Sequence, residues 1–377
     1  MARPTRSRAA LAAALTLAAS LALSACGSSD DDKPAGPQGS SDEIKTQAEA
    51  AVKPYTTRPT SIGITEPIQG PIPSDKTIAY MNCSLPSCSE IGEIVKDAAS
   101  VLGWKTVSIN IGATPETVKA GWEQAVKLKP DAVIGQGYGP EIYSEELDEL
   151  NKLDIPVILS SIAENDPRLT ALFQEGNTAV VKAGAIQADW VLAKYGSDAE
   201  TLAIDVPDLT SIHSWFTGFS DEYKRLCPNC KLGKVEFAST DLGTPKTASQ
   251  IAGYVQANPG TNAIMMSVAS IALGLPEALS ALDYDGSVGV LNADEATRDY
   301  MRQGKITVSN STDWATTVWK EIDTAARHML GQSVQPDLDA PENYFLYTAD
   351  TIPEGQGYAT PYVADYQEQF KKLWGVS

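Results

Sequence analysis

Short apolar runs alternate with helix-period patterns along the chain from about residue 76 onward. Residues 77–81 form a strand-like apolar run, and in residues 91–102 the apolar positions recur every three or four residues. Two such series, the second starting at residue 178, predict an α/β chain with two similar lobes, each a parallel sheet flanked by helices. The other predicted strands are residues 105–109, 132–134, 156–160, 202–206, 234–237, 263–267 and 306–309, and the other predicted helices are 115–128, 144–153, 178–195, 212–226, 247–257 and 315–330.

A different pattern precedes the lobes. Residues 1–25 begin with a basic stretch, continue with an apolar run and end in small residues before Cys26. This is the layout of a secretory signal, and its apolar run is too short to span a bilayer comfortably. Residues 23–26 (Leu-Ser-Ala-Cys) resemble the bacterial lipobox, which implies that Cys26 is lipidated and anchors the chain to the outer face of the cell membrane. An ordinary signal peptide cut nearby is the alternative.

The segment between Cys26 and the first lobe is expected to be a spacer. Residues 27–41 are polar and lack apolar periodicity, which is typical of a flexible tether. Residues 43–53 favour a short helix, and the prolines between residues 54 and 73 favour an extended lead-in.

Charge narrows the classes of partner. The 377 residues contain 29 Lys and Arg against 48 Asp and Glu, a formal net charge of −19. Loss of residues 1–25, which hold three Arg and no acid, makes it about −22. The chain has no basic block after its first residues, so nucleic acid is not an expected partner. With two His, a multi-His metal centre is excluded, and no metal is expected.

The remaining four cysteines form two local pairs. Cys83 lies five residues before Cys88, and Cys227 lies three residues before Cys230. Outside the cytoplasm each pair should form a disulfide. A four-thiolate zinc site and a thioredoxin-like redox motif remain as alternatives.

Catalytic motifs are missing from the sequence. It has no Gly-x-Ser-x-Gly elbow for acyl transfer and no phosphate-cradling Gly-Lys-Ser/Thr motif, and the glycine run at residues 135–139 lacks dinucleotide-binding spacing. We therefore expect that the protein is not an enzyme and binds no cofactor, although a glycosidase-like carboxylate pair stays possible in principle. The loops after the strands are the candidate binding segments, because parallel sheets bind ligands beyond the carboxyl ends of their strands.

Four motifs, taken in order and spacing, indicate a family. They are residues 98–104 (Ala-Ala-Ser-Val-Leu-Gly-Trp), 130–134 (Pro-Asp-Ala-Val-Ile), 154–158 (Asp-Ile-Pro-Val-Ile) and 263–267 (Ala-Ile-Met-Met-Ser). Over about residues 76–374 the chain resembles the type I periplasmic-binding-protein family, nearest the ribose-binding-like sugar lipoproteins of ABC importers and similar to actinobacterial versions.

The resemblance implies a fold and a mode of action. Two Rossmann-like lobes would be joined by a three-segment hinge, with crossings near Gly176, residues 292–294 and residues 335–343. The lobes would be residues 76–176 plus about 293–336, and residues 177–292 plus about 340–377. A monomer would close on a small-molecule ligand and deliver it to permease subunits served by a separate ATPase. A surface sensor signalling to a membrane receptor is the alternative, whereas the lipoprotein signal replaces the DNA-binding headpiece of related transcription factors.

The sequence departs from the sugar-binding pattern where that family binds its ligand. Where sugar-binding relatives have an Asp-Arg pair, this sequence has Ser161 and Ile162. The relatives' Arg, Asp and Gln correspond here to His213, Asn292 and Asn310. The stacking aromatics expected after the first strand are missing from residues 82–88. We therefore expect a mostly neutral pocket and a less polar ligand: a modified sugar, an aromatic acid, or a terpenoid or steroid fragment. The candidate ligand-binding residues are Asn82, Ser84, Gln136, Tyr138, Ser160, Ser161, Thr210, His213, Trp215, Leu242, Ala269, Asn292, Asp294, Asn310, Asp313 and Trp314.

Some of these candidates have a plainer interpretation. His213 opens a helix after a strand and could meet a ligand carbonyl or anion, or could be a surface or capping residue. Trp215 and Phe219 are four residues apart, which also suits the core face of a helix.

Overall fold

The computed structural model describes residues 40–83, 85–163, 165–352 and 361–376. The described residues belong to one compact unit, residues 39–377. The predicted signal, Cys26 and most of the tether, together with Ser84, therefore lie outside the described residues. Within them, no helix is long and apolar enough to cross a membrane.

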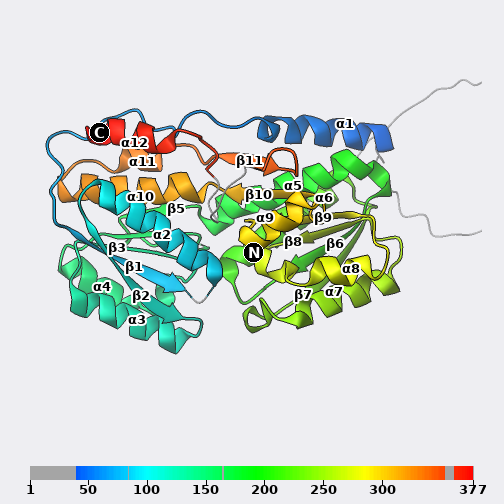
Figure 1. Cartoon of the computed structure of the whole chain (residues 1–377), viewed down its shortest axis with the longest axis horizontal. Coiled ribbons are helices and arrows are strands. Elements are labelled where there is room, and N and C mark those ends of the chain that lie inside the picture. Colours follow the sequence, from blue (N-terminus) through cyan, green and yellow to red (C-terminus); the bar gives the residue numbers. More distant parts are fainter. Residues whose placement is uncertain (1–39, 84, 164, 353–360, 377) are drawn as a thin grey trace, which may run out of the picture. The chain divides into compact units, whose positions relative to one another are not determined.

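The first sheet has five parallel strands in the order β2-β1-β3-β4-β5 (Figure 1). Alternate residues of β1 face opposite layers: Ile78 and Tyr80 pack with α2 and α10, whereas Ala79 and Met81 pack with α3 and α4. The strands are β1 Thr77–Cys83, β2 Lys105–Gly112, β3 Ala132–Gln136, β4 Val157–Ser160 and β5 Ala171–Phe173, and the helices are α2 Pro86–Val101, α3 Pro115–Leu128, α4 Ser144–Lys152 and α10 Trp314–Met329.

The second sheet has six strands in the order β11-β10-β9-β8-β6-β7, and β11 alone is antiparallel to its neighbour in this sheet. Helices α5 and α6 cover one face, and α7, α8 and α9 cover the other. The strands are β6 Glu200–Asp205, β7 Lys231–Glu236, β8 Ala263–Met266, β9 Ser287–Leu291, β10 Val308–Thr312 and β11 Tyr344–Tyr347, and the helices are α5 Val181–Tyr195, α6 Thr210–Leu226, α7 Pro245–Ala257, α8 Leu275–Ser280 and α9 Glu295–Arg302.

Short helical turns fill the connections. They are η1 Lys53–Thr56, η2 Pro140–Ile142, the π-helical turn η3 Gly176–Val180, η4 Gly196–Asp198, η5 Ser239–Asp241, η6 Ala269–Ala272 and α11 Gln335–Leu338.

The segments that link the lobes differ in part from the predicted ones. The first crossing lies at Gly176, where a Cβ would come within 2.9 Å of the Ala163 Cα, so the close backbone approach requires glycine. The second lies near Asp313, between β10 and α10, and not at residues 292–294. The third lies between α11 and β11, within residues 335–343. A further crossing follows β11, because Tyr362 is buried in the second-lobe core and Val363 in the first-lobe core, so the predicted three-segment hinge has too few crossings.

Two segments therefore belong to the other lobe from the one the sequence predicted. Helix α9 and strand β10 lie in the second lobe, because Met301 is buried in its core and β10 pairs with β9. Helix α12 (Tyr366–Trp374) lies in the first lobe, because Phe370 and Trp374 pack on Trp319 of α10.

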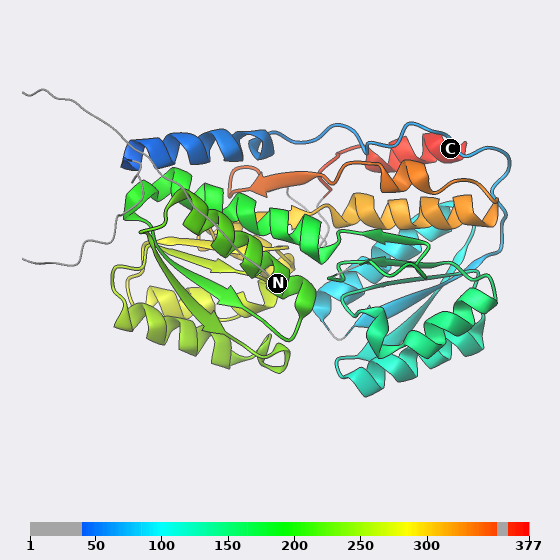
Figure 2. The same ribbon diagram turned by 180° about the vertical axis from the view of Figure 1, so that it is seen from behind.

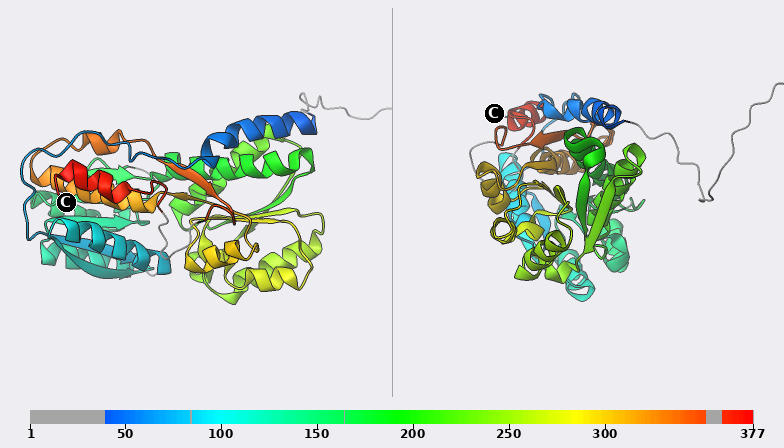
Figure 3. Two further views of the ribbon diagram at one scale, coloured as in Figure 1. Left: turned by 45° about the horizontal axis from the view of Figure 1, so that its top comes forward. Right: turned by 90° about the vertical axis from the view of Figure 1, so that its right-hand side faces the viewer.

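The N-terminal arm, residues 40–75, runs along both lobes (Figures 2 and 3). Helix α1 (Ser41–Val52) lies on α5 and buries Ile44, Ala48 and Val52 in the second-lobe core. Beyond it, Ile62, Ile64 and Ile68 are buried in the first-lobe core.

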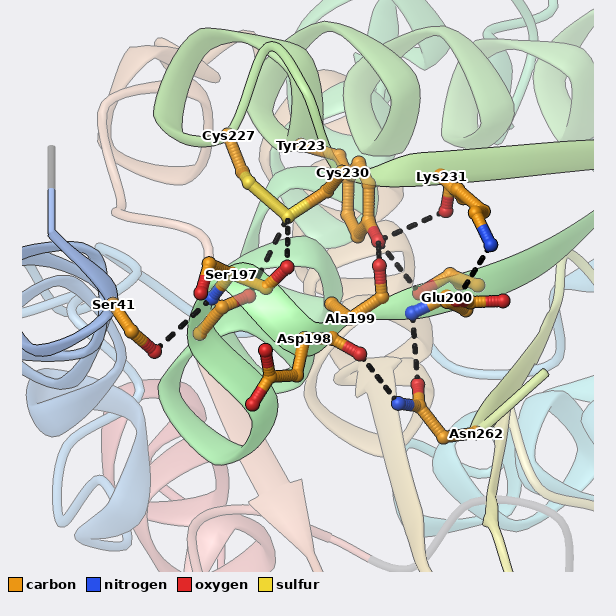
Figure 4. The surroundings of a disulfide bond; sticks show 12 residues. Ser41, Ser197, Asp198, Ala199, Glu200, Tyr223, Cys227, Cys230, Lys231 and Asn262 are labelled. Carbon is orange, nitrogen blue, oxygen red and sulfur yellow. Dashed lines mark hydrogen bonds and ion pairs between the residues drawn. A yellow bond between two sulfur atoms is a disulfide. The ribbon is translucent and has the colours of Figure 1, made fainter. Parts of the chain in front are cut away.

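Both cysteine pairs are disulfides, as predicted, with Cα–Cα distances of 5.5 Å for Cys83–Cys88 and 5.3 Å for Cys227–Cys230. The second closes the end of α6 beside Tyr223, whose hydroxyl donates to the carbonyls of Ala199 and Lys231 (Figure 4). The two pairs lie in different lobes and are each bonded internally, so the four-thiolate zinc alternative is wrong.

Candidate ligand-binding site

A cavity lies between the carboxyl ends of the two sheets. Its volume of about 920 Å³ includes space that is open to solvent. Residues that follow strands of both sheets line it, which is where doubly wound sheets place ligands. The lining residues are Cys83, Leu85, Ser87, Cys88, Ile91, Ala113, Gln136, Gly137, Tyr138, Ser161, Val180, Leu209, Ser211, Ile212, Ser239, Leu242, Ser267, Val268, Leu291, Asn292 and Trp314.

The end of β1 and the first turns of α2 supply an apolar wall, which we call the disulfide wall: Cys83, Leu85, Cys88 and Ile91. The disulfide closes the loop, and the Tyr80 hydroxyl donates to the Cys88 carbonyl at 2.5 Å. Burial raises the pKa of Tyr80 well above its ordinary value, so this hydroxyl keeps its proton. The wall is therefore held by a covalent bond at one point and by a buried hydrogen bond at another.

Gln136 ends β3 next to this wall. Its Nε2 donates to the Tyr80 hydroxyl at 2.6 Å, so Tyr80 links the strand to the disulfide loop. Gly137 follows with φ of +82°, a left-handed conformation that glycine adopts without strain. Tyr138, next in the loop, lines the cavity, and its carbonyl accepts from the Tyr143 hydroxyl at 2.8 Å.

The second lobe contributes three serines, the serine wall, from the ends of neighbouring strands. Ser211 follows β6, Ser239 follows β7 and Ser267 follows β8, and β6 pairs with both of the other strands. The Ser239 hydroxyl donates to Asp208 at 2.7 Å. Ser267 is 1% exposed, and its Oγ has no hydrogen-bond partner among the described residues.

Helix α6 begins at this serine wall without a side-chain cap. The first intrahelical bond runs from the His213 N–H to the Leu209 carbonyl. The preceding N–H groups, of Thr210, Ser211 and Ile212, have no acceptor among the described residues, as expected for an uncapped first turn. Helix α10 differs, because Asp313 accepts from the Thr316 N–H and caps it.

Among the described residues, the lining carries no charged side chain at neutral pH. Burial, and then the negative charge of Asp208, raise the pKa of Tyr138 above its usual value, so Tyr138 stays neutral. The cavity thus offers apolar contact and a few neutral hydrogen-bonding groups.

The structure gathers six of the predicted site residues at the cavity: Gln136, Tyr138, Ser161, Leu242, Asn292 and Trp314. Asn292 has φ of +55°, a left-handed conformation that asparagine tolerates better than most residues. Asn82, Ser160 and Thr210 are not among the lining residues: Asn82 donates to the Ser108 hydroxyl at 3.4 Å, Ser160 is buried, and Thr210 is exposed.

His213 and Trp215 do not line the cavity. The His213 Nδ1 lies 3.0 Å from both carboxylate oxygens of buried Asp205, which also pairs with the Lys234 Nζ at 2.9 Å. This pairing directs the imidazole to the end of β6 instead of the cavity. Trp215 is fully buried and stacks on Phe219 at 5.2 Å, so the core interpretation of this spacing is correct.

The remaining predicted residues serve the fold. The Asn310 side chain is buried, where it donates to the Ala183 carbonyl at 2.8 Å and accepts from Gln187. Asp294 and Asp313 cap α9 and α10. Ala269 is buried in the second-lobe core, whereas Ser267 and Val268 line the cavity, so the predicted position was one to two residues too late.

Sequence reasoning missed most of the two walls. It treated the cysteines as staples only, and it overlooked the apolar residues that precede α2 and α6. A usable signal was present: Leu85 and Leu209 each stand in a post-strand loop directly before a helix, where a polar cap is ordinarily preferred.

Comparison with known proteins gives a family and a set of structures with the same fold. Residues 78–333 match the family model described as a periplasmic binding protein domain. Solved structures share the fold at low identity. The glucose-galactose binding protein GanP of Geobacillus stearothermophilus is 17% identical, with 74% of this chain and 99% of that chain covered and a TM-score of 0.62. No curated protein matches.

Two further solved structures show the range of this fold. A periplasmic ribose ABC transporter protein from Conexibacter woesei is 14% identical over 76% of this chain and 95% of its own, with a TM-score of 0.59. A putative LacI transcriptional regulator from Bacteroides fragilis is 14% identical over 74% and 98%, with a TM-score of 0.62. At such identities the likeness shows the fold alone.

Proposed function

Because this chain belongs to the periplasmic binding protein family, we propose that it is the solute-binding component of an ABC importer, which captures a small molecule between its lobes. The observation that carries the proposal is the cavity at the carboxyl ends of both sheets. Residues from both lobes line it, so a bound molecule would contact both and favour their closure. The permease subunits, with a separate ATPase, would receive the closed form.

The hinge segments lie next to the cavity, which supports a closing motion. Ser161 lines the cavity, and its hydroxyl donates to the Gln174 amide oxygen at 3.2 Å, just before the Gly176 crossing. Trp314 lines it directly after the Asp313 crossing. A ligand touching these residues would therefore act on two of the connections between the lobes.

The lining supports a ligand less polar than a free sugar. A polyhydroxylated ligand is ordinarily held by charged side chains that both accept and donate strongly, and the part of the lining that the structure describes has none. Leu85, Ile91, Leu242 and Val268 instead offer apolar contact. A modified sugar, an aromatic acid, or a terpenoid or steroid fragment fits this chemistry, although the relatives named above include glucose-galactose and ribose proteins.

The expected location at the membrane completes the proposal. Lipid on Cys26 would hold a monomeric chain on the outer face of the membrane, with residues 27–39 as its tether, because α1 begins at Ser41 after its cap Ser40. Signalling of the closed form to a membrane receptor is the competing function. Loss of uptake of the bound compound on deleting this chain supports import, and unchanged uptake with a lost transcriptional response supports sensing.

A thermal-shift screen tests the binding function and the ligand chemistry together. Pentoses and hexoses are compared with aromatic and steroid acids and with uncharged aromatic and steroid ketones, and we expect stabilisation by the less polar compounds. Stabilisation by a common pentose or hexose alone would contradict the less polar ligand.

A matched pair of variants places the binding in the cavity. Leu242→Glu puts a charge in the lining and should reduce affinity for the best compound by about tenfold or more. Leu128→Glu, on the exposed end of α3, is the control and should leave the affinity unchanged. Equal effects of the two changes would locate binding elsewhere.

A further inference from the structure

The cleft has two chemically different walls, and the difference points to the class of molecule it takes. We infer that its ligand is a neutral molecule with an apolar body packed on the disulfide wall and a hydrogen-bond-accepting oxygen, such as a carbonyl, facing the serine wall. This rests on the proposed solute-binding function and narrows it.

The disulfide wall is built to stay in place. Cys88 is 4% exposed and is held by its bond to Cys83, while its carbonyl accepts from the buried Tyr80 hydroxyl. Leu85 and Ile91 extend the apolar surface on either side. A rigid apolar wall favours a ligand with a matching apolar face, because little conformational entropy is lost when the two surfaces meet.

The serine wall has hydrogen-bonding capacity that the described residues do not use. The buried Ser267 hydroxyl has no partner among them, and the first N–H groups of α6 have no acceptor there. A buried polar group without a partner is costly, and a ligand atom that satisfies it relieves that cost. N–H groups require an acceptor, so the ligand group at this wall is an oxygen with free lone pairs.

Charge decides between a neutral acceptor and a carboxylate. No cationic side chain of the described residues lines the cavity, so an anion would be desolvated without a counter-charge. Asp208, two residues before α6 and hydrogen-bonded to Ser239, adds a negative charge on the same side. The uncapped helix end favours an anion only modestly, and this nearby charge opposes it. The neutral acceptor is favoured.

Titration calorimetry on the full chain tests the inference with three probes. Acetylnaphthalene and naphthoate share an apolar ring system and differ in a neutral carbonyl against a carboxylate, and glucose is the polyol. We expect acetylnaphthalene to bind at least about tenfold more tightly than naphthoate or glucose. Ser267→Ala should weaken acetylnaphthalene binding by about threefold to tenfold.

The two disulfides provide a matched pair of variants. The double change Cys83→Ala and Cys88→Ala should weaken acetylnaphthalene binding by about tenfold, whereas Cys227→Ala with Cys230→Ala, at the far end of α6, should leave it unchanged. Because loss of a disulfide can impair folding, Leu85→Ser is a second test. It places a helix cap at the start of α2 yet removes an apolar side chain from the wall, and it should weaken the same probe.

The outcomes separate this inference from the proposed function. Tightest binding of naphthoate or glucose, or equal loss with both disulfide pairs, overturns the two-walled cleft while solute binding stands. Failure of all three probes also overturns it, and solute binding then depends on the wider sugar and acid screen. Only a chain that binds nothing in either experiment contradicts the proposed function itself.

Discussion

A single buried carboxyl in α10 gives the first lobe a pH-dependent stability. Glu321 is 1% exposed, and burial raises its pKa to about 8, against the opposing charge of the neighbouring Lys320. Burial also raises the pKa of Asp313, at the start of the same helix, to about 6. Both groups bind a proton more tightly in the folded chain than in the unfolded chain, where their values are 4.5 and 3.8.

The sign of the effect follows from linkage. Between the unfolded and folded pKa of Glu321, the folded chain holds the extra proton, so the free energy of unfolding falls as the pH rises from about 4.5 toward about 8. Glu321→Gln imitates the protonated form. We expect it to match the parent chain at pH about 5 and to exceed it by at least about 1 kcal/mol at pH about 9, measured by urea unfolding.

The control for this change is Glu141→Gln, at an exposed position of η2, which should leave the free energy of unfolding unchanged at both pH values. If the free energy of unfolding of Glu321→Gln changes between the two pH values by as much as that of the parent chain, the burial argument is wrong.

The site residues show which features of a single residue can be read from sequence. Post-strand loops were identified correctly, so Gln136, Tyr138 and Asn292 were placed at the cavity. The direction of each side chain was not, because it depends on partners outside the loop: buried Asp205, at the end of β6, holds His213, and Gln187, 123 residues away, holds Asn310. A residue number in a loop fixes a neighbourhood, and tertiary pairing fixes the direction of the side chain.

At the scale of elements, the N-terminal arm is part of the folded body. In the second lobe, Tyr55 packs edge-on against Tyr344 at 6.0 Å, and Arg58 lies over the Phe345 ring at 5.7 Å. In the first lobe, the Ile62 N–H donates to the Gln369 side chain at 3.1 Å, and the Ile68 N–H donates to the Leu373 carbonyl at 3.0 Å. The arm is therefore an additional connection between the lobes.

Removing one apolar side chain from the arm should cost as much as removing one from a central core. Ile62 is 1% exposed and packs in the first-lobe core, so Ile62→Ala should lower the free energy of unfolding by about 2–4 kcal/mol. Val107→Ala, at a site that is 38% exposed, is the control and should change it by less than about 0.5 kcal/mol. Chemical denaturation measures both, and a cost for Ile62→Ala no larger than the control would show that the arm does not contribute to the core.

Long amphipathic elements could be predicted from the sequence. Short strands, and the lobe to which an element belongs, could not. The helix predicted at residues 115–128 is α3, with matching ends, because Thr114 caps it and apolar Val118, Trp122 and Ala125 recur on one face. Strand β5 was missed, since three residues carry no usable period. The lobe membership of β10 and α12 was also mispredicted, because strand pairing and the stacking of Trp374 on Trp319 decide it.

At the scale of the whole molecule, the account rests on one relation between the lobes: a small molecule in the cavity should draw them together. The acidity of the chain adds little to this, because none of the described residues that line the cavity is charged, and acids such as Asp294 and Asp313 cap helices.

The most direct test is the distance across the cleft with and without a bound compound. Spin labels at Glu141→Cys and Lys246→Cys, exposed positions next to the Tyr138 and Leu242 loops, would report it by pulsed electron resonance on the full chain. We predict that the compound giving the largest thermal stabilisation shortens this distance, and that Leu242→Glu abolishes the shortening. Stabilisation with an unchanged distance would contradict capture by closure of the lobes.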